Sequence, residues 1–470
     1  MTQVDQLASF VVRASYDDLS ATAIRELKGR VLDALGCAVA ALDAEPMRML
    51  SAQFDEFGGV GLCTLIGGGR TAPDRAALYN SALVRYLDFN DTYLAAGEAC
   101  HPSDNLGAVL AAAEYAGQSG RELLTSLAVA YQVQCRLCDV APVRAKGFDH
   151  VTHGAYAVAA GVAHALGLDE VRAAHALAIC GTALNALRVT RTGALSHWKG
   201  LAYANTAFAA TQATFLAMRG ITGPLEVFEG NKGFMETIAG PFTIDWPRED
   251  LERVTHTIVK KYNAEAHSQS ALEAAWELRW QHPFKPEEIT RIELDTFGAA
   301  YHIIGGGEEG DKTLVRTKEQ ADHSLPYLVA VMLLDGQVKP EQFRAERIAR
   351  RDVQNLLRKV VVRPVDALSR QFPAQMPCRL RITLADGRSW VQERQDYEGY
   401  HTQPMPWEAI VRKFDGLSAP HADAGLRAAI VQAVADLETI PVSQLTGLLA
   451  AARRSGAASE EVEKQLLAEV

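Results

Sequence analysis

The hydrophobic pattern of this chain changes its period twice, and this change limits the folds that the chain can adopt. Apolar residues recur at helical spacing from the start to about residue 268. From about residue 288 they alternate with polar residues, as in half-exposed strands. Helical spacing returns after Pro404. The pattern predicts a mainly α fold, in which a smaller α+β domain is inserted before the C-terminal helices.

Local signals support the two helical parts. Ser20 is a good N-cap for a helix whose apolar face carries Ile24, Leu27, Val31 and Leu35. A second helix is expected to begin at Asn105 and to end near Gly117. The span 155–217 is rich in Ala and Gly, which predicts closely packed helices. Further helices are expected over 409–414, 425–437 and 443–451.

The middle of the chain is predicted to form the α+β domain. Strands are expected over 289–297, 360–362, 379–384 and 389–394. The last two flank Asp386-Gly387, a strong hairpin signal. Helices are expected over 326–334 and 344–357. We therefore predict an all-helical domain of 1–268 and 404–470 and an α+β domain of 269–403, which is a usual domain size.

Composition excludes several classes of protein. The 470 residues carry a formal net charge of −10, which disfavours nucleic-acid binding because phosphate contacts need a basic face. We expect no membrane span, because no stretch reaches the roughly 20 apolar residues that one requires. Seven cysteines without a paired spacing pattern indicate a reducing compartment, so we predict a cytoplasmic protein.

Four segments combine His or Lys with Gly, Pro, Ser or Asn. The richest is 260–269, which holds Lys260, Lys261, Tyr262, Glu265 and His267. The other three are 101–105, 153–154 and 197–200. Any one of them could be an ordinary solvated or buried segment. Together they are typical of a pocket for a multiply charged acid.

Two metal hypotheses compete with this interpretation. Cys135 and Cys138 form a Cys-x-x-Cys pair, which with a distant cysteine could hold an iron–sulfur cluster. The pair lies in a helix-like run, 127–139, without Gly or Pro to wrap a cluster, and buried cysteines are common. His150 and His153 could share a helix face as metal ligands, but no third ligand accompanies them at a metal-binding spacing.

Taken together, several motifs resemble those of the MmgE/PrpD family. They are Asp88 to Asp91, His101 to Asn105, His153-Gly154, Ser196 to Gly200, Lys260 to Gln269 and Thr317 to Tyr327. The family includes 2-methylcitrate dehydratases, cis-aconitate decarboxylases and an iminodisuccinate epimerase. The resemblance implies a large all-helical domain with a smaller α+β lid domain, a homodimer, and neither metal nor cofactor. The Tyr-Asn-Ala-Glu-Ala-His-Ser-Gln segment resembles the MmgE-type 2-methylcitrate dehydratases.

The expected chemistry is elimination of water from a tricarboxylate. A proton α to a carboxylate is removed while hydroxide leaves, so cations must neutralise the developing charge. Lys199 and either Lys260 or Lys261 are the candidate cations. His101 and His153 are the candidates for proton transfer, with Asp91 orienting one imidazole. Ser103 and Asn105 open a helix whose N–H groups could bind a substrate carboxylate.

His267, His323 and Tyr327 complete the predicted substrate-binding set. For each candidate a structural role is the alternative: His101 as a helix entry, His153 as a core histidine, Lys199 as a surface partner of Trp198, and Tyr327 as a packing residue. Decarboxylation of cis-aconitate or epimerisation of a related dicarboxylate would use the same pocket. A non-catalytic polycarboxylate-binding protein is the alternative from another class.

Overall fold

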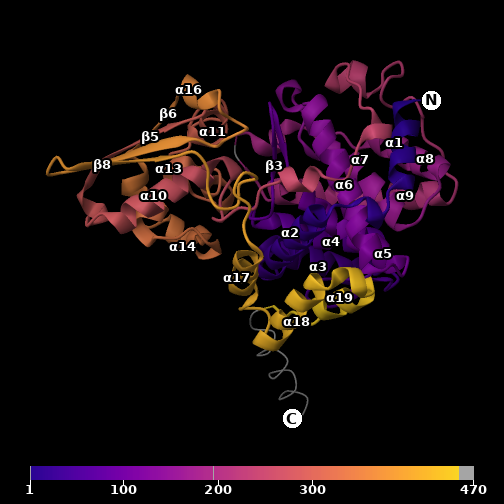
Figure 1. Ribbon diagram of the computed structural model, residues 1–470. Helices are drawn as coiled ribbons and strands as arrows, with labels where there is room; N and C mark the ends of the chain where they lie inside the picture. Colours follow the sequence, from indigo (N-terminus) through magenta and orange to yellow (C-terminus); the bar gives the residue numbers. More distant parts are fainter. Residues whose placement is uncertain (1, 194, 455–470) are drawn as a thin grey trace, which may run out of the picture. The chain divides into compact units, whose positions relative to one another are not determined.

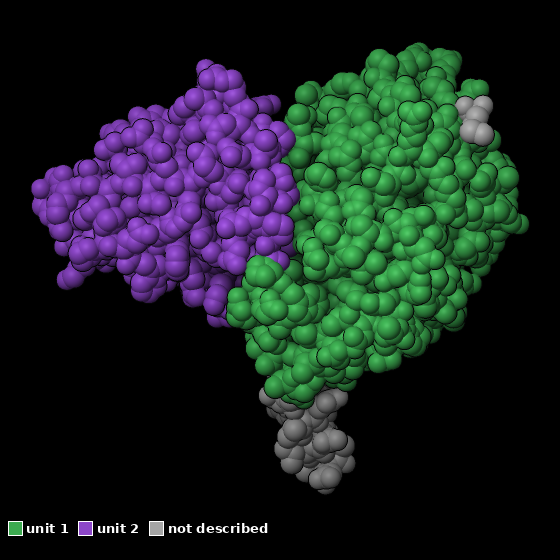
Figure 2. Space-filling view, viewed as in Figure 1, with its two compact units in different colours: residues 1–187, 200–257, 406–470 green, residues 188–199, 258–405 purple. Residues whose placement is uncertain are grey.

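The structure is a computed structural model that describes residues 2–193 and 195–454. Its residues form two compact units (Figure 2). Unit 1 comprises residues 1–187, 200–257 and 406–470, and unit 2 comprises residues 188–199 and 258–405. Helices dominate and the strands are few, which confirms the predicted mainly α class with a small mixed sheet.

Unit 1 is a helical assembly in which α2 packs against α17, α4 against α5, and α6 against α7 (Figure 1). Small residues permit these close approaches. A Cβ atom on Gly107 of α5 would lie 2.3 Å from the Ser81 nitrogen of α4. The helices of unit 1 are α1 (Gln3–Arg13), α2 (Ala21–Ala40), α3 (Glu45–Phe57), α4 (Pro73–Tyr86), α5 (Leu106–Tyr115), α6 (Gly120–Val140), α7 (Val151–Ala165), α8 (Glu170–Ala183), α17 (Trp407–Ser418), α18 (Ala424–Ala435) and α19 (Val442–Leu449), together with most of α9 (Trp198–Met218).

The predicted helix signals agree with this arrangement. The Ser20 hydroxyl accepts a hydrogen bond of 3.0 Å from the Ala23 N–H at the start of α2. Asn105 is the N-cap of α5, and Gly117 follows the helix with φ of 67°. The three predicted C-terminal helices correspond to α17, α18 and α19. Short-range capping and periodicity therefore locate these helices well.

Unit 2 is built on a four-stranded sheet in the order β6-β5-β7-β8. The strands are β5 (Ile289–Thr296), β6 (Val360–Pro364), β7 (Cys378–Leu384) and β8 (Ser389–Arg394). β5 pairs with β6 in parallel and with β7 in antiparallel fashion. β7 and β8 form the hairpin predicted from Asp386-Gly387, and Gly387 adopts a φ of 89°. All four predicted strands are confirmed.

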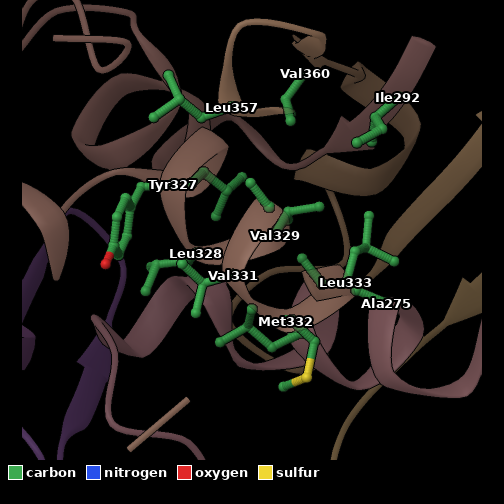
Figure 3. Close-up of a cluster of buried hydrophobic side chains, with 14 of the residues drawn as sticks. Ala275, Ile292, Tyr327, Leu328, Val329, Val331, Met332, Leu333, Leu357 and Val360 are labelled. Carbon is green, nitrogen blue, oxygen red and sulfur yellow. The ribbon is translucent and has the colours of Figure 1, made fainter. Parts of the chain in front are cut away.

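Helices α10 (Gln269–Gln281) and α13 (Leu325–Asp335) pack against this sheet. They bury a cluster that includes Ala275 of α10, Ile292 of β5, Val360 of β6 and much of α13 (Figure 3). One helix prediction is wrong. The expected helix over 344–357 is two helices, α14 (Ala345–Ile348) and α15 (Arg351–Leu357), because Arg350 between them is extended with ψ of 139°.

The first strand of unit 2 is preceded by a long segment that belongs to the same unit. Residues 258–268 lie in unit 2, because the Val259 N–H donates to Gly399 O and the Asn263 N–H donates to Val338 O. The boundary between the units therefore lies at 257/258. The sequence-based domain boundary lies later, at 268/269, and it stays a prediction. Residues 188–199, including Lys199, also belong to unit 2.

Unit 1 also contains two short hairpins. β1 (Cys63–Thr64) pairs with β2 (Arg70–Thr71), and β3 (Tyr93–Ala95) pairs with β4 (Glu98–Cys100). The β3–β4 hairpin brings its two ends together, so that His101 after β4 lies beside Asp91 before β3. Within the described ranges, no helix is long and apolar enough to cross a membrane.

Candidate active-site residues

The predicted site residues lie in both units, and each group is described within its own unit. Five residues of unit 1 form what we call the histidine cluster: Arg85, Asp91, His101, Asp149 and His150. The segment from Asp88 to Asp91 connects α4 to the β3–β4 hairpin, and Asp88 has a left-handed φ of 56°. This conformation is costly for a residue other than glycine, and it turns the chain sharply after α4.

The contacts of His101 define its tautomer. Its Nδ1 lies 2.8 Å from the main-chain oxygen of Asp91. Its Nε2 lies 3.2 Å from Arg85 Nη2. A carbonyl oxygen can only accept and a guanidinium can only donate, so Nδ1 carries the proton and Nε2 presents its lone pair. The ring is thus held as a neutral imidazole whose unprotonated nitrogen accepts a hydrogen bond from Arg85, and its role in proton transfer stays a prediction.

Asp91 contacts His101 differently from the expectation. The sequence predicts that Asp91 orients one imidazole, and the contact with His101 is made by its main-chain oxygen rather than by its carboxylate. The carboxylate instead accepts hydrogen bonds from the Ser103 N–H at 3.0 Å and the Tyr131 hydroxyl at 2.7 Å. Burial raises the pKa of Asp91, and the bonds from Tyr131 and Ser103 partly oppose that effect.

Ser103 and Asn105 are bonded within unit 1. The Ser103 N–H, which we expected to be available to a substrate, is occupied by Asp91. The Asn105 amide donates to Pro102 O and to Gln134 Oε1, each at 2.8 Å, and its oxygen accepts from the Tyr203 hydroxyl. These bonds make the helix entry rigid. A role of either residue in carboxylate binding stays a prediction.

His150 belongs to this cluster, although the sequence suggested it only as a metal ligand. Its ring meets that of His101 edge to face, with centroids 5.4 Å apart. Its Nδ1 lies 2.8 Å from Asp149 Oδ1, and both residues are buried. The adjacent Asp149-His150 pair at the start of α7 was the signal that could have identified it, because carboxylates commonly orient active imidazoles.

His153 lies one turn further along α7, in a different environment. Its ring is completely buried. Its Nε2 is 2.8 Å from Ala141 O and its Nδ1 is 3.5 Å from Cys138 Sγ. Burial alone would lower the pKa of His153, but the neighbouring Cys138 raises it. This is the geometry of a hydrogen-bonded core histidine, the alternative that the sequence left open.

The pair Cys135 and Cys138 lies on α6. Both thiols belong to a buried cluster with Cys100, Tyr93 and Ala95. Burial favours the neutral thiol of Cys138, but the Cys100 thiol and the His153 imidazole outweigh it and lower the pKa of Cys138. Cys138 and His153 therefore act as a mutually stabilising pair inside unit 1.

Unit 2 contains what we call the cationic cluster: Lys199, Lys260, His267 and His323, with Glu265 and Asp322 as counter-ions. Lys199 Nζ lies 2.6 Å from Asp322 Oδ1 and 2.9 Å from His323 Nδ1. Lys199 is 3% exposed whereas Trp198 is 49% exposed, so Lys199 is not the surface partner of Trp198. Lys199 is thus a buried cation whose charge Asp322 balances, and its role in substrate binding stays a prediction.

Glu265 links the remaining members of the cationic cluster. Its carboxylate lies 2.6 Å from His267 Nδ1 and also accepts the His267 N–H. Burial would raise the pKa of Glu265, but the charges of His267, His323 and Lys260 prevail and lower it to about 2. Glu265 is therefore ionised, and it holds the cluster together.

The two adjacent lysines have different environments. The side chain of Lys260 is fully buried, and its charge acts on Glu265. Lys261 is partly exposed and lies 3.0 Å from Glu273 and 3.6 Å from Glu398. Lys260 thus belongs to the cationic cluster, whereas Lys261 lies outside it, between Glu273 and Glu398. The sequence left this choice open.

Tyr327 lies within the apolar core of unit 2, among the side chains of α13 (Figure 3). Its hydroxyl donates to Gln342 O. The sequence offered a binding role or a packing role for Tyr327, and these contacts are those of a packing residue.

Lys312 is a residue that the sequence did not suggest. Burial lowers the pKa of this lysine, and the nearby charges of Glu309 and Glu265 oppose that effect.

Comparison with known proteins agrees with these motifs. The model of the MmgE/PrpD N-terminal domain matches residues 5–247, and the model of the C-terminal domain matches residues 262–439. A 2-methylcitrate dehydratase of Cupriavidus necator is 28% identical, over 94% of this chain and 96% of that protein. A cis-aconitate decarboxylase of Mus musculus is 26% identical, over 83% of this chain and 81% of its own.

An alkylcitrate dehydratase from a fungus is also 26% identical, over 73% of each chain. These relatives differ in reaction, so the match does not by itself select one substrate. The two domain models nevertheless cover most of the chain, in the order in which the domains occur. The chain belongs to the MmgE/PrpD family.

Proposed function

We propose that this chain is a hydro-lyase that eliminates water from 2-methylcitrate to give 2-methyl-cis-aconitate, without a cofactor. Its family-level activity, as an enzyme of the dehydratase and decarboxylase kind, follows from relatives with those names. The observation that carries the proposal is the pair of adjacent imidazoles, His101 and His150, each held by a different partner. Dehydration needs one base and one acid, and this pair supplies both.

The partners of the two imidazoles suggest their roles. Arg85 beside Nε2 of His101 favours the neutral ring, which makes His101 the proposed base. Asp149 beside Nδ1 of His150 favours the imidazolium, which makes His150 the proposed acid. His101 takes the proton α to a carboxylate, the electron pair forms the double bond, and the departing hydroxyl takes a proton from His150 and leaves as water.

The cationic cluster supplies the other requirement of the reaction. The carbanion-like transition state places further negative charge on a substrate that is already anionic. Lys199 and Lys260 are the proposed carboxylate-binding groups, assisted by His267 and His323. Their buried positions strengthen the interaction, because charges act more strongly when water is excluded. A citrate dehydratase activity is also expected, since one methyl group in a pocket discriminates by only about 10- to 200-fold.

Two alternatives use the same residues. A decarboxylase would release carbon dioxide from cis-aconitate, as the name of the mouse relative indicates for that protein. An epimerase would return the proton to the opposite face of a related dicarboxylate.

The proposal also includes a cytoplasmic homodimer. Light scattering should then give a mass twice that of one chain.

A product assay tests the proposal directly. Chelator-treated protein is offered 2-methylcitrate, citrate, cis-aconitate and iminodisuccinate in parallel, with the His101→Asn variant as the inactive control. Formation of 2-methyl-cis-aconitate by the unmodified chain alone supports the dehydratase. Formation of itaconate would favour the decarboxylase instead, and an epimerised product would favour the epimerase. Tight binding of an acid without any turnover would favour the binding protein.

A further inference from the structure

Lys413, on the C-terminal helix α17, reaches the segment that supports His101. Its Nζ lies 2.6 Å from Asp33 Oδ1 of α2 and donates a 2.8 Å hydrogen bond to Phe89 O. The same nitrogen lies 3.7 Å from the centroid of the Phe89 ring. The lysine and Asp33 are both buried. Three elements far apart in the sequence are therefore joined at one ammonium group inside unit 1.

Phe89 lies in the segment that defines the tautomer of His101. Asp88 before it has a φ of 56°, and its carboxylate lies 2.6 Å from Arg85 Nη1. Asp91, two residues after Phe89, supplies the oxygen that accepts the His101 Nδ1 proton. A segment with such a strained residue keeps its conformation only if the surroundings hold it on both sides. Arg85 holds the side chain of Asp88, and Lys413 holds the carbonyl group of Phe89.

Lys413 differs from a lysine that only joins helices in the location of its acceptor, because Phe89 O lies in the segment beside His101. Lys28 of α2 provides the comparison, because its Nζ donates to Ala435 O at 2.6 Å and forms an ion pair with Glu438. Lys28 joins α2 to the C-terminal part of the chain, as Lys413 does. Like Lys413, it contacts one main-chain oxygen and one carboxylate. Lys28 makes neither of these contacts with the Asp88 to Asp91 segment.

We propose that Lys413 is a positioning residue for His101: by holding Phe89 O it keeps Asp91 O where it accepts the Nδ1 proton. This inference deepens the proposed function and rests on His101 being the base. When the contact is lost, the Asp91 oxygen shifts away from Nδ1, and the Thr92 hydroxyl, whose Oγ1 lies 3.1 Å from Nδ1, can donate to it instead. His101 then also populates the tautomer with its proton on Nε2, for which Arg85 Nη2 must give up its hydrogen bond to that nitrogen. That tautomer has no lone pair on Nε2, so turnover falls while substrate binding is preserved.

The experiment compares two variants that differ in one donor. Asp33→Asn removes the buried carboxylate and keeps the ammonium on Phe89 O. Asp33→Asn/Lys413→Met also removes that ammonium, and it leaves no unpaired charge, which avoids the large cost of a broken buried ion pair. Lys28→Met is the matched control. Each is assayed for kcat, KM, the pH profile of kcat/KM and thermal melting.

We expect Asp33→Asn and Lys28→Met to keep kcat near that of the wild type, even if both melt earlier. The double variant should lose kcat by about 10- to 100-fold, as supporting residues of active histidines do, with little change in KM. The acidic limb of its pH profile should also shift. A double variant with unchanged kcat and pH profile would overturn the proposal, as would an equal loss of kcat in Lys28→Met.

A second measurement separates this inference from the proposed function. Histidine-specific 15N NMR reports the tautomer of His101 whether or not the protein turns over any of the four acids, and His101→Asn assigns the signals. The wild type should show an Nδ1-protonated ring, and the double variant a mixture. An unchanged tautomer in the double variant would refute the role of Lys413, whereas an inactive wild type with the expected tautomers would refute only the dehydratase.

Discussion

The rings of His101 and His150 meet edge to face, with their planes at 70° and their centroids 5.4 Å apart. Each ring has its own fixed neighbour: the Arg85 guanidinium for His101 and the Asp149 carboxylate for His150. Two imidazoles in contact but in opposite electrostatic environments are suited to opposite protonation states. This difference is the basis of the first prediction.

His150→Asn should lower kcat by about 10²- to 10⁴-fold, the usual contribution of a general acid or base. The fold should survive because asparagine retains a polar group near Asp149. The rate should fall because asparagine cannot transfer a proton. The check is steady-state kinetics on protein whose melting temperature is within a few degrees of the wild type. Normal kcat in a folded His150→Asn variant would remove His150 from proton transfer.

His153 provides the matched comparison on the same helix. Because its ring bonds Ala141 O and contacts Cys138, His153→Asn should leave buried groups unsatisfied and cost about 1–3 kcal/mol of stability. Activity per folded molecule should change much less than in His150→Asn. If instead His153→Asn abolishes turnover without loss of stability, His153 takes part in proton transfer, as the sequence predicts.

The outcome for these histidines shows what the sequence could and could not predict. Local rules located the Ser20 cap and the Asp386-Gly387 hairpin, because each depends on neighbours within a few residues. The same rules placed His153 on a helix but could not show that its face packs against α6. Burial depends on contacts between distant segments, so the difference between His150 and His153 appears only in the folded chain.

Long-range contacts also explain the other differences. Residues 258–268 read as the end of the helical part, but main-chain bonds to Gly399 and Val338 place them in unit 2. Tyr327 follows a proline at a helix start, where the sequence leaves a binding role and a packing role open, and it packs in the core around α13. The choice between Lys260 and Lys261 needed the positions of Glu273 and Glu398.

Lys199→Met should raise the KM for tricarboxylates by about tenfold or more, since an ionic contact to a carboxylate contributes roughly 1.5–3 kcal/mol. It also removes one partner of the buried Asp322 carboxylate, which keeps its contacts with Lys318 and His323, so some stability will be lost as well. The double variant Lys199→Met/Asp322→Asn should not recover the KM, whatever its melting temperature, which also reflects the lost contacts of Asp322 with Lys318 and His323. Recovery of the KM would mean that Lys199 serves only to neutralise Asp322.

The seven cysteines are all buried, which predicts that they react slowly. Burial raises the pKa of Cys63, Cys180 and Cys378 to about 12 each, so little of their thiolate is present at neutral pH. The pKa of Cys138 is lowered, but complete burial shields this thiol from the reagent. Native protein should therefore release almost no colour from a disulfide reagent, and denatured protein should react at seven sites. Rapid reaction of any thiol in the native protein would show that its segment opens readily.

Stability should fall steeply in acid because of Glu265. Its pKa is lowered to about 2 in the folded chain from the ordinary value of 4.5, through His267, His323 and Lys260 and despite the opposing effect of burial. A carboxyl with a depressed folded-state pKa stabilises the fold above its unfolded pKa, and that stabilisation disappears as the pH falls towards the folded pKa.

The window for this effect therefore lies between pH 4.5 and pH 2, and the shift corresponds to about 3 kcal/mol. Urea unfolding of the wild type across this range should show stability decreasing with pH. Glu265→Gln cannot titrate, so its stability should be lower at pH 5 and should depend less on pH below that. Parallel pH dependences in the two proteins would mean that the contacts of Glu265 with His267 do not stabilise the folded chain.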